Sequence, residues 1–199
     1  MAKNTQPIAK KCKALGISPA TMGYFTKETT RNPGGQTRKK KSEYATQLNE
    51  KQKVKFVYGI LEKQFRGYYE KASKMAGKTG ENLLILCESR LDNVVYRLGY
   101  ASTRREARQM VNHGHFTING KKVNIPSYQV KPGMVVALKE SSRSIERFKM
   151  NLEANEFHVI PKWLEFDADT LTGKVVALPQ RDDIDLTIEE HLIVEFYSR

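Results

Sequence analysis

The segment 90–138 constrains the fold of this chain more than any other, because two helical patterns and a hairpin signal follow one another within it. Apolar residues recur at helical spacing over 91–98, and Gly99 suits the left-handed position that often ends a helix. A second helix is predicted to begin after Thr103, since Glu106 lies three residues further on, as in a capping box. The first half of the segment therefore predicts two short consecutive helices.

The second predicted helix has two unlike faces when its residues are spaced at about 100° around the axis. Its apolar sector, which needs a core to pack against, consists of Ala107, Met110 and Val111. Its polar sector contains Arg104, Arg105, Arg108 and Asn112. None of the three arginines has an acidic residue four positions further on with which to pair. Such a face can simply be solvated, but guanidinium groups also match the geometry of phosphate oxygens.

A β-hairpin is predicted directly after Gly114, which is expected to end the second helix. Residues 115–118 alternate as in a strand, and Asn119-Gly120 is the strongest short-range signal for a hairpin turn. The lysines after this turn and the histidines before it border the same surface as the arginines, which favours RNA binding over a solvated face. The RNA contacts expected in the segment are Arg90, Arg104, Arg105, Arg108, His113, His115, Lys121 and Lys122.

The run TRREARQMVNHGHFTINGKKV over 103–123 resembles the RNA-binding module named after ribosomal protein S4. That module also occurs in tyrosyl-tRNA synthetases, pseudouridine synthases and a ribosome-associated heat-shock protein, so alone it implies structured RNA and nothing narrower. The flanks are more specific. Residues 42–72 resemble the first long helical segment of the bacterial small-subunit ribosomal protein S4 family, and 190–198, EHLIVEFYS, resemble its end.

A long helix is predicted over 42–74, because apolar residues keep a helical spacing throughout it. Gly59 and Gly67 each weaken such a helix by roughly 1 kcal/mol relative to alanine, so we expect close packing or a bend there. Basic residues lie mostly off the apolar line and are expected to form a second RNA surface. They are Lys51, Lys53, Lys55 and Arg66.

The N-terminal region 1–41 is rich in Lys, Thr, Gly and Pro and shows little periodicity. Its cation run is predicted to follow RNA phosphates, and the resemblance matches it to a basic loop near the mRNA path. The run consists of Arg38, Lys39, Lys40 and Lys41.

Family members often carry four cysteines in the N-terminal region that bind zinc, but this region has only Cys12, and Cys87 lies far away. One cysteine cannot supply a tetrahedral site, so we predict a zinc-independent form without cofactors.

The charge of the chain is unevenly distributed. The net charge is +12, yet residues 151–199 carry 4 basic and 11 acidic residues. The first three quarters therefore suit a polyanionic partner, and the acidic end is a candidate for contact with a basic neighbouring protein. No apolar stretch approaches the roughly 20 residues of a membrane helix, and no signal-peptide core follows the basic start. A protein of the cytoplasm, or of an organelle matrix after processing, is therefore expected.

The expected fold class is α+β. A basic extension (1–41) precedes a helical domain (42–89), to which the resemblance implies that residues 180–199 return. An RNA-binding module with a β extension (90–179) combines two helices and a hairpin or small sheet. Strands are expected at 134–138, 163–167 and 174–178, and a polar helix is expected over 144–156.

The resemblance implies a structural constituent of the small ribosomal subunit rather than an enzyme, and no catalytic constellation stands out in the sequence. Such a protein is a primary binder of 16S rRNA that nucleates assembly, contacts neighbouring ribosomal proteins, lines the channel through which mRNA enters, and contributes to translational accuracy. Three alternatives remain at this level: a free RNA chaperone or ribosome-recycling factor, a zinc-sparing paralogue of a cysteine-rich copy, and an enzyme acting on RNA. No membrane or small-molecule substrate is expected.

Overall fold

The computed structural model describes residues 6–24, 42–155 and 159–198, and it divides into two compact units. Among the described residues, the first unit extends to Arg66 and includes the C-terminal residues from Leu186, and the second unit runs from Gly67 to Asp185. This division differs from the predicted domain boundary after residue 89. Residues 67–89 pack with the RNA-binding module, because Tyr68 and the helix that follows it contact the module directly.

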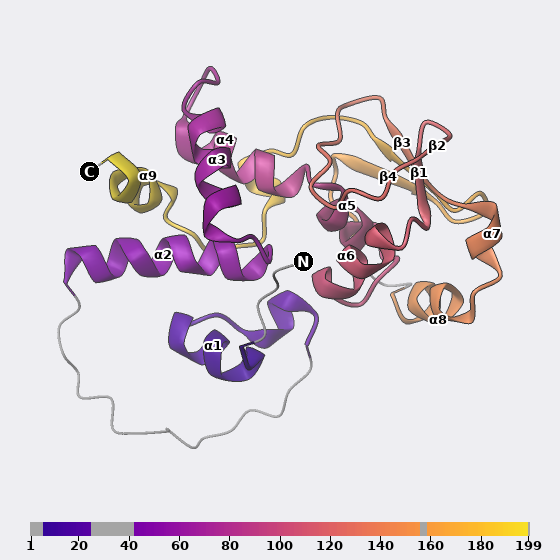
Figure 1. The fold of residues 1–199 in the computed structure, drawn as a ribbon, viewed down its shortest axis with the longest axis horizontal. Coiled ribbons are helices and arrows are strands. Elements are labelled where there is room, and N and C mark those ends of the chain that lie inside the picture. The colour runs from indigo at the N-terminus through magenta and orange to yellow at the C-terminus, as the bar shows by residue number, and fades with distance from the viewer. Residues whose placement is uncertain (1–5, 25–41, 156–158, 199) are drawn as a thin grey trace. The chain divides into compact units, whose positions relative to one another are not determined.

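The first unit is helical (Figure 1). Its elements are α1 (Ile8–Leu15), a 3₁₀ turn (Pro19–Met22), α2 (Glu43–Val57), the start of α3 (Glu62–Ala72) and α9 (Glu190–Ser198). Ser42 caps α2, since its Oγ accepts a hydrogen bond of 3.2 Å from the N–H of Ala45. The helix predicted over 42–74 is divided into α2 and α3, and the interruption lies at Gly59, one of the two expected weak points, which adopts a φ of +63°. Gly67 lies inside α3.

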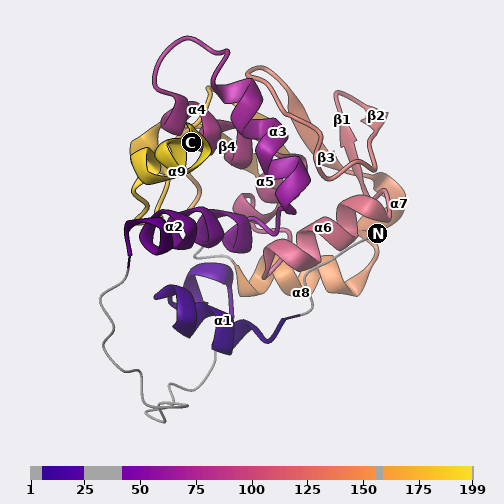
Figure 2. The ribbon, with the colours of Figure 1, turned by 60° about the vertical axis from the view of Figure 1, so that its left-hand side comes forward.

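The C-terminal helix α9 packs on α2, as Figures 1 and 2 both show. The rings of Tyr44 and Phe196 lie 5.5 Å apart between centroids, and Gln47 Nε2 donates a hydrogen bond of 3.0 Å to Glu195 Oε2. Ile193 is fully buried. The C-terminal tail therefore returns to the first unit from Leu186 on, whereas residues 180–185 belong to the second unit.

The second unit combines helices with one sheet. Its elements are the end of α3, α4 (Thr79–Glu88), α5 (Leu91–Arg97), α6 (Arg104–Asn112), β1 (Phe116–Ile118), β2 (Lys121–Lys122), β3 (Val135–Leu138), α7 (Glu140–Arg143), α8 (Glu146–Ala154), β4 (Leu164–Asp167), β5 (Thr172–Val175) and a 3₁₀ turn (Arg181–Asp183). The polar helix predicted over 144–156 is confirmed by α8, which lies within that range, and the short helix α7 precedes it. The α+β class is confirmed.

All strand pairs in the sheet are antiparallel, and their order is β2-β1-β3-β5-β4. Phe116 pairs with Leu138, and Val136 pairs with Gly173. The strand predicted at 174–178 begins earlier, so that Gly173 lies inside β5. A Cβ at Gly173 would lie 2.3 Å from Leu98 Cδ1, and the glycine therefore lets the sheet approach the end of α5 closely.

The core of the second unit lies between this sheet and the helices α5, α6 and α8. Tyr100 and Phe116 are both fully buried, and their rings meet edge-to-face with centroids 5.2 Å apart. Tyr100 also donates a hydrogen bond of 2.6 Å to the carbonyl of Leu171. These contacts hold the segment between α5 and α6 against the sheet, and the apolar side of α6 belongs to the same core.

Candidate nucleic-acid interface

Helix α6 begins where the sequence predicts. Thr103 is the N-cap, and its Oγ1 accepts a hydrogen bond of 3.2 Å from the N–H of Glu106. The reciprocal bond is displaced by one residue, because Glu106 Oε2 accepts from the N–H of Ser102 at 3.0 Å. The predicted apolar sector is buried, with Ala107, Met110 and Val111 all in the core. The orientation of α6 is thus fixed at its first turn and along its inner face.

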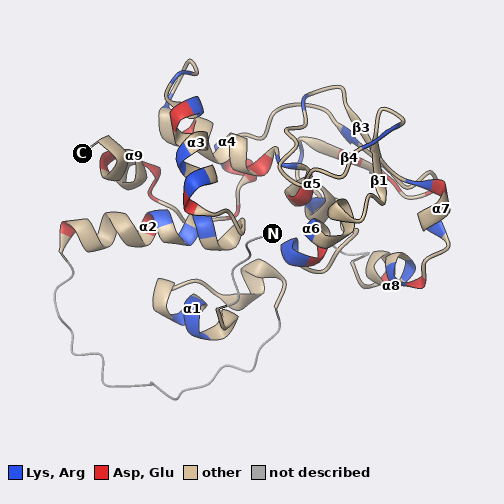
Figure 3. Cartoon of the chain, viewed as in Figure 1, with Lys and Arg blue, Asp and Glu red and all other residues tan. Residues whose placement is uncertain are grey.

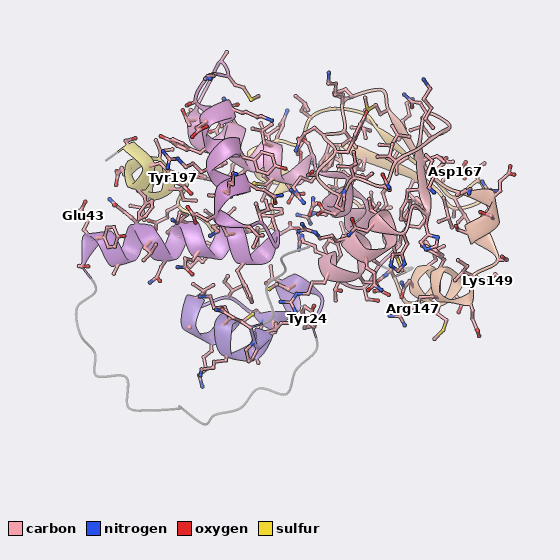
Figure 4. The ribbon with its side chains drawn as sticks, in the orientation of Figure 1. Tyr24, Glu43, Arg147, Lys149, Asp167 and Tyr197 are labelled. Atoms are coloured by element: carbon pink, nitrogen blue, oxygen red, sulfur yellow. The ribbon has the colours of Figure 1, made fainter. Side chains whose placement is uncertain are left out.

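Glu106 also joins α6 to α8. Its Oε1 accepts hydrogen bonds from Arg147 Nε at 2.7 Å and Asn151 Nδ2 at 3.2 Å; Figure 4 labels Arg147. Partial burial of Glu106 favours the neutral acid, but the bonds from Arg147, Asn151 and Ser102 outweigh it and hold the pKa below its ordinary value. The negatively charged carboxylate near the N-terminus of α6 also suits the helix dipole.

The outward face of α6 carries the three predicted arginines, and Figure 3 shows basic residues gathered at this helix. Arg105 is exposed, whereas Arg104 and Arg108 are half-buried. Arg104 lies over the ring of Tyr96, and its Nε donates a hydrogen bond of 2.8 Å to Asn93 Oδ1. The helix therefore presents basic side chains on the face opposite its buried sector.

The hairpin places two further cations beside α6. Asn119 and Gly120 have φ values of 48° and 79°, as a two-residue hairpin turn of the predicted kind requires. Lys121 and Lys122 follow the turn and are exposed. The aliphatic part of Lys122 crosses the end of α6, since a Cβ at Gly114 would lie 2.4 Å from Lys122 Cε.

The two predicted histidines differ in environment. His113 is exposed, and His115 is half-buried, with its Nδ1 2.9 Å from Ser142 Oγ and its ring against Phe148. Burial is the largest cause that lowers the pKa of His115, and electrostatic interactions with His113, Lys122 and Lys139 lower it further. The rings of His113 and His115 lie 5.9 Å apart between centroids, and the N–H of Lys139 donates a hydrogen bond of 2.9 Å to the carbonyl of His115.

Sequence reasoning missed Lys139, which is exposed and belongs to this group. It comes directly after the last residue of β3, in the position where the chain leaves the sheet. The antiparallel pairing of β1 with β3 brings that end of β3 next to the start of β1. The sequence showed only that a lysine follows a predicted strand. The pairing of β1 with β3 is needed to place this lysine near the start of β1.

Arg90 requires a correction, because it is fully buried in the second unit rather than on a surface. Its Nε and Nη2 bond to the two carboxylate oxygens of Asp92 at 2.9 and 2.5 Å, and Nη1 donates to the Tyr68 hydroxyl at 2.8 Å. Burial acts to lower the pKa of Arg90, but Asp92 raises it above the ordinary value. A guanidinium group paired in this way holds α5 to α3 and is not presented to a phosphate.

The second predicted RNA surface is also corrected in part. Lys51 is buried, with Nζ 3.0 Å from Glu62 Oε1 and 4.1 Å from the centroid of the Phe196 ring. Lys55 Nζ lies 2.5 Å from Glu62 Oε2, and Lys53 forms an ion pair with Glu50. These lysines therefore make ion pairs inside the first unit.

Two other sets of residues predicted to bind RNA are not corrected by the structure. Arg66 is exposed on α3. The run Arg38, Lys39, Lys40 and Lys41 lies outside the described residues. Both remain predictions.

No cluster of metal-ligating side chains occurs within residues 6–24, 42–155 and 159–198. Cys12 is buried, and its Sγ lies 3.9 Å from Met22 Sδ. Burial raises the pKa of both the Cys12 and the Cys87 thiols. In the same part of the chain, no helix is both long and apolar enough to cross a membrane.

The fold and the basic face of α6 define an RNA-binding protein built around an S4 domain. The family model of the S4 domain matches residues 89–136, and that of the ribosomal protein S4/S9 N-terminal domain matches residues 3–88.

Proteins from several bacteria are similar in sequence to most or all of this chain. The small ribosomal subunit protein uS4 of Lachnoclostridium phytofermentans is 53% identical over 200 residues, with both chains covered completely. The protein of the same name from Fusobacterium nucleatum is 51% identical over 199 residues, again with complete coverage of both. That of Acetivibrio thermocellus is 62% identical over 165 residues, which are 83% of this chain and 79% of the relative. The chain belongs to the uS4 family of small ribosomal subunit proteins.

Proposed function

We propose that this protein is a structural constituent of the small ribosomal subunit, and that it binds 16S rRNA early and nucleates assembly. The observation that supports this most is the geometry of α6. Its apolar side is held in the core while Arg104, Arg105 and Arg108 lie on the opposite face, beside Lys122 of the hairpin. Full-length similarity to uS4 proteins points to ribosomal RNA as the ligand.

The physical form of this surface suits an RNA duplex. The deep, narrow major groove of A-form RNA keeps its base edges out of reach, so proteins read the positions of phosphates and 2′-hydroxyl groups. A helix held along one whole face presents cations at fixed spacing, and guanidinium groups can bind phosphate oxygens with two hydrogen bonds. The surface therefore suits recognition of RNA shape rather than of a base sequence.

Further contacts are proposed from the family resemblance. The run from Arg38 to Lys41 would lie near the channel through which mRNA enters the ribosome, and through it the protein would contribute to translational accuracy. The acidic C-terminal region would contact a basic neighbouring protein of the small subunit. In this role the protein would work in the ribosomes of the cytoplasm.

Binding of the purified full-length protein to the naked 5′ domain of 16S rRNA tests the proposal. The titration is run across a salt series with a tRNA competitor, because phosphate contacts alone lose affinity steeply as salt rises. We expect tight binding that survives both the competitor and high salt. Equal, salt-sensitive binding of both RNAs would refute a primary binding role and would favour a free RNA chaperone or recycling factor.

A further inference from the structure

Two side chains of α5 hold Arg104, the first arginine of α6. Its Nε donates a hydrogen bond of 2.8 Å to Asn93 Oδ1, and its Cζ lies 4.4 Å from the centroid of the Tyr96 ring. The hydrogen bond fixes one edge of the guanidinium group, and the ring supports its plane. By contrast, Arg105 is exposed to solvent.

The amide of Asn93 can hold Arg104 in one orientation only. Asn93 is 2% exposed, and its Nδ2 donates to the backbone carbonyl of Glu88 at 2.9 Å and to the Glu88 carboxylate. With both N–H groups directed at Glu88, the carbonyl oxygen of the amide must face Arg104. A flipped amide would set an N–H donor against the N–H of Arg104 Nε and an oxygen against the carboxylate.

Glu88 in turn is held by a buried ion pair. It is 1% exposed, and Arg97 donates to its two oxygens at 2.9 and 3.3 Å. Arg97 also forms an ion pair of 3.0 Å with Asp185. A continuous polar network therefore runs from α4 through α5 to the outer face of α6.

We propose that Asn93 is a positioning residue, which orients Arg104 for a phosphate of bound RNA while Tyr96 supports the guanidinium group. The inference rests on the proposed RNA-binding function and deepens it. A flexible arginine loses side-chain freedom when it binds a phosphate, and one already held loses less. Arg104 therefore contributes more to affinity than Arg105, although Arg105 is the more exposed.

A double-mutant cycle tests this assignment. Binding of full-length wild type, N93A, R104A and the double variant is titrated against a generic A-form RNA duplex and, in parallel, against the 5′ domain of 16S rRNA. We expect N93A to weaken binding about two- to tenfold, the range that follows from immobilising one side chain. In the R104A background, N93A should change affinity less than twofold. An equal loss in both backgrounds, or no loss in either, would overturn the proposal.

A second pair of variants tests the proposal independently if N93A misfolds. Y96L removes the ring beneath the guanidinium group, and Y96F keeps it as the matched control. We expect Y96L, but not Y96F, to weaken binding, and only when Arg104 is present. The ¹H–¹⁵N signal of Arg104 Nε should be resolved and slow to exchange in the wild type, and lost in N93A. An unchanged Nε signal in a folded N93A would contradict the proposal.

The two RNAs separate this inference from the proposed function. Coupling between Asn93 and Arg104 on the generic duplex decides the positioning role, whether or not the rRNA fragment is preferred. Preference for the rRNA fragment over tRNA decides the role in assembly.

Discussion

Replacing Glu62 by glutamine should destabilise the first unit at neutral pH and leave it unchanged in strong acid. Glu62 accepts hydrogen bonds from Lys51 at 3.0 Å, Lys55 at 2.5 Å and the Tyr197 hydroxyl at 2.8 Å, and Tyr197 is labelled in Figure 4. It thereby joins α2, α3 and α9. A neutral amide offers one acceptor oxygen and no charge, so Lys51, whose side chain is only 8% exposed, would lose its ionic partner.

The size of the effect follows from the pKa of Glu62. Burial acts to raise this pKa, but the bonds from Lys55, Tyr197 and Lys51 outweigh it and lower the pKa from 4.5 to about 2. That difference corresponds to about 3 kcal/mol in favour of the folded, ionised state. Because the Glu62 side chain is 48% exposed, solvent screening reduces the expected contribution to about 1–2 kcal/mol.

The sign of the pH dependence is fixed by the direction of the pKa change. A lowered pKa in the folded state adds stability above pH 4.5, and this stability is lost as pH falls toward 2. The E62Q variant should therefore have an unfolding free energy about 1–2 kcal/mol below that of the wild type at pH 7. The difference in unfolding free energy between E62Q and the wild type should disappear between pH 4.5 and 2. Other carboxyl groups titrate in both proteins and therefore do not affect this difference.

Urea unfolding followed by far-UV circular dichroism measures this difference. The single tryptophan, Trp163, is buried in the second unit, so its fluorescence follows the unfolding of that unit separately. The matched control is E81Q, because Glu81 accepts from Lys78 at 2.8 Å in an exposed pair worth at most about 0.5 kcal/mol. The reasoning would be refuted by equal stabilities of E62Q and wild type at pH 7, or by a deficit that persists at pH 2.

Two further predictions concern the second unit. The double variant R104A/R108A should stay folded, because neither arginine belongs to the apolar side of α6; the slope of log affinity against log salt for duplex RNA should fall by about 1–2. An unchanged slope would mean that neither arginine contacts a phosphate. G173A should lower the unfolding free energy by about 1–3 kcal/mol, measured by Trp163 fluorescence, because the added Cβ would lie 2.3 Å from Leu98 Cδ1. Wild-type stability in G173A would show that the sheet can shift away from α5 without cost.

Features that depend on residues close in sequence were predictable. The N-cap at Thr103, the buried sector of α6 and the Asn119-Gly120 turn each rest on contacts within a few positions, and the structure contains all three. The break at Gly59 was less certain, since a glycine inside an apolar pattern is compatible with a bend or with close packing. Signals from residues close in sequence therefore predict the candidate interface well and the lengths of the helices less well.

The residues predicted to bind RNA and found buried share a physical cause. Arg90 and Lys51 are charged by type, and the position of Lys51 off the apolar line of its helix suggested solvent exposure. Each is satisfied by acceptors or rings that only the folded chain supplies, Tyr68 for Arg90 and Phe196 for Lys51. The aliphatic stems of such residues pack in a core readily once the charged group has partners. A helical pattern places a residue on a face but does not say what covers that face.

The uneven charge along the sequence likewise does not show which charged residues have partners in the folded chain. The net charge of +12 and the acidic composition of 151–199 suggested a basic body for RNA and a separate acidic end for a protein partner. In the structure, Asp185 pairs with Arg97, and Glu195 contacts Gln47 of α2, so part of the acidic region serves the fold. Cations paired within a unit release few counterions when RNA binds. The salt dependence of RNA binding should therefore correspond to the cations of α6 and the hairpin rather than to the total positive charge.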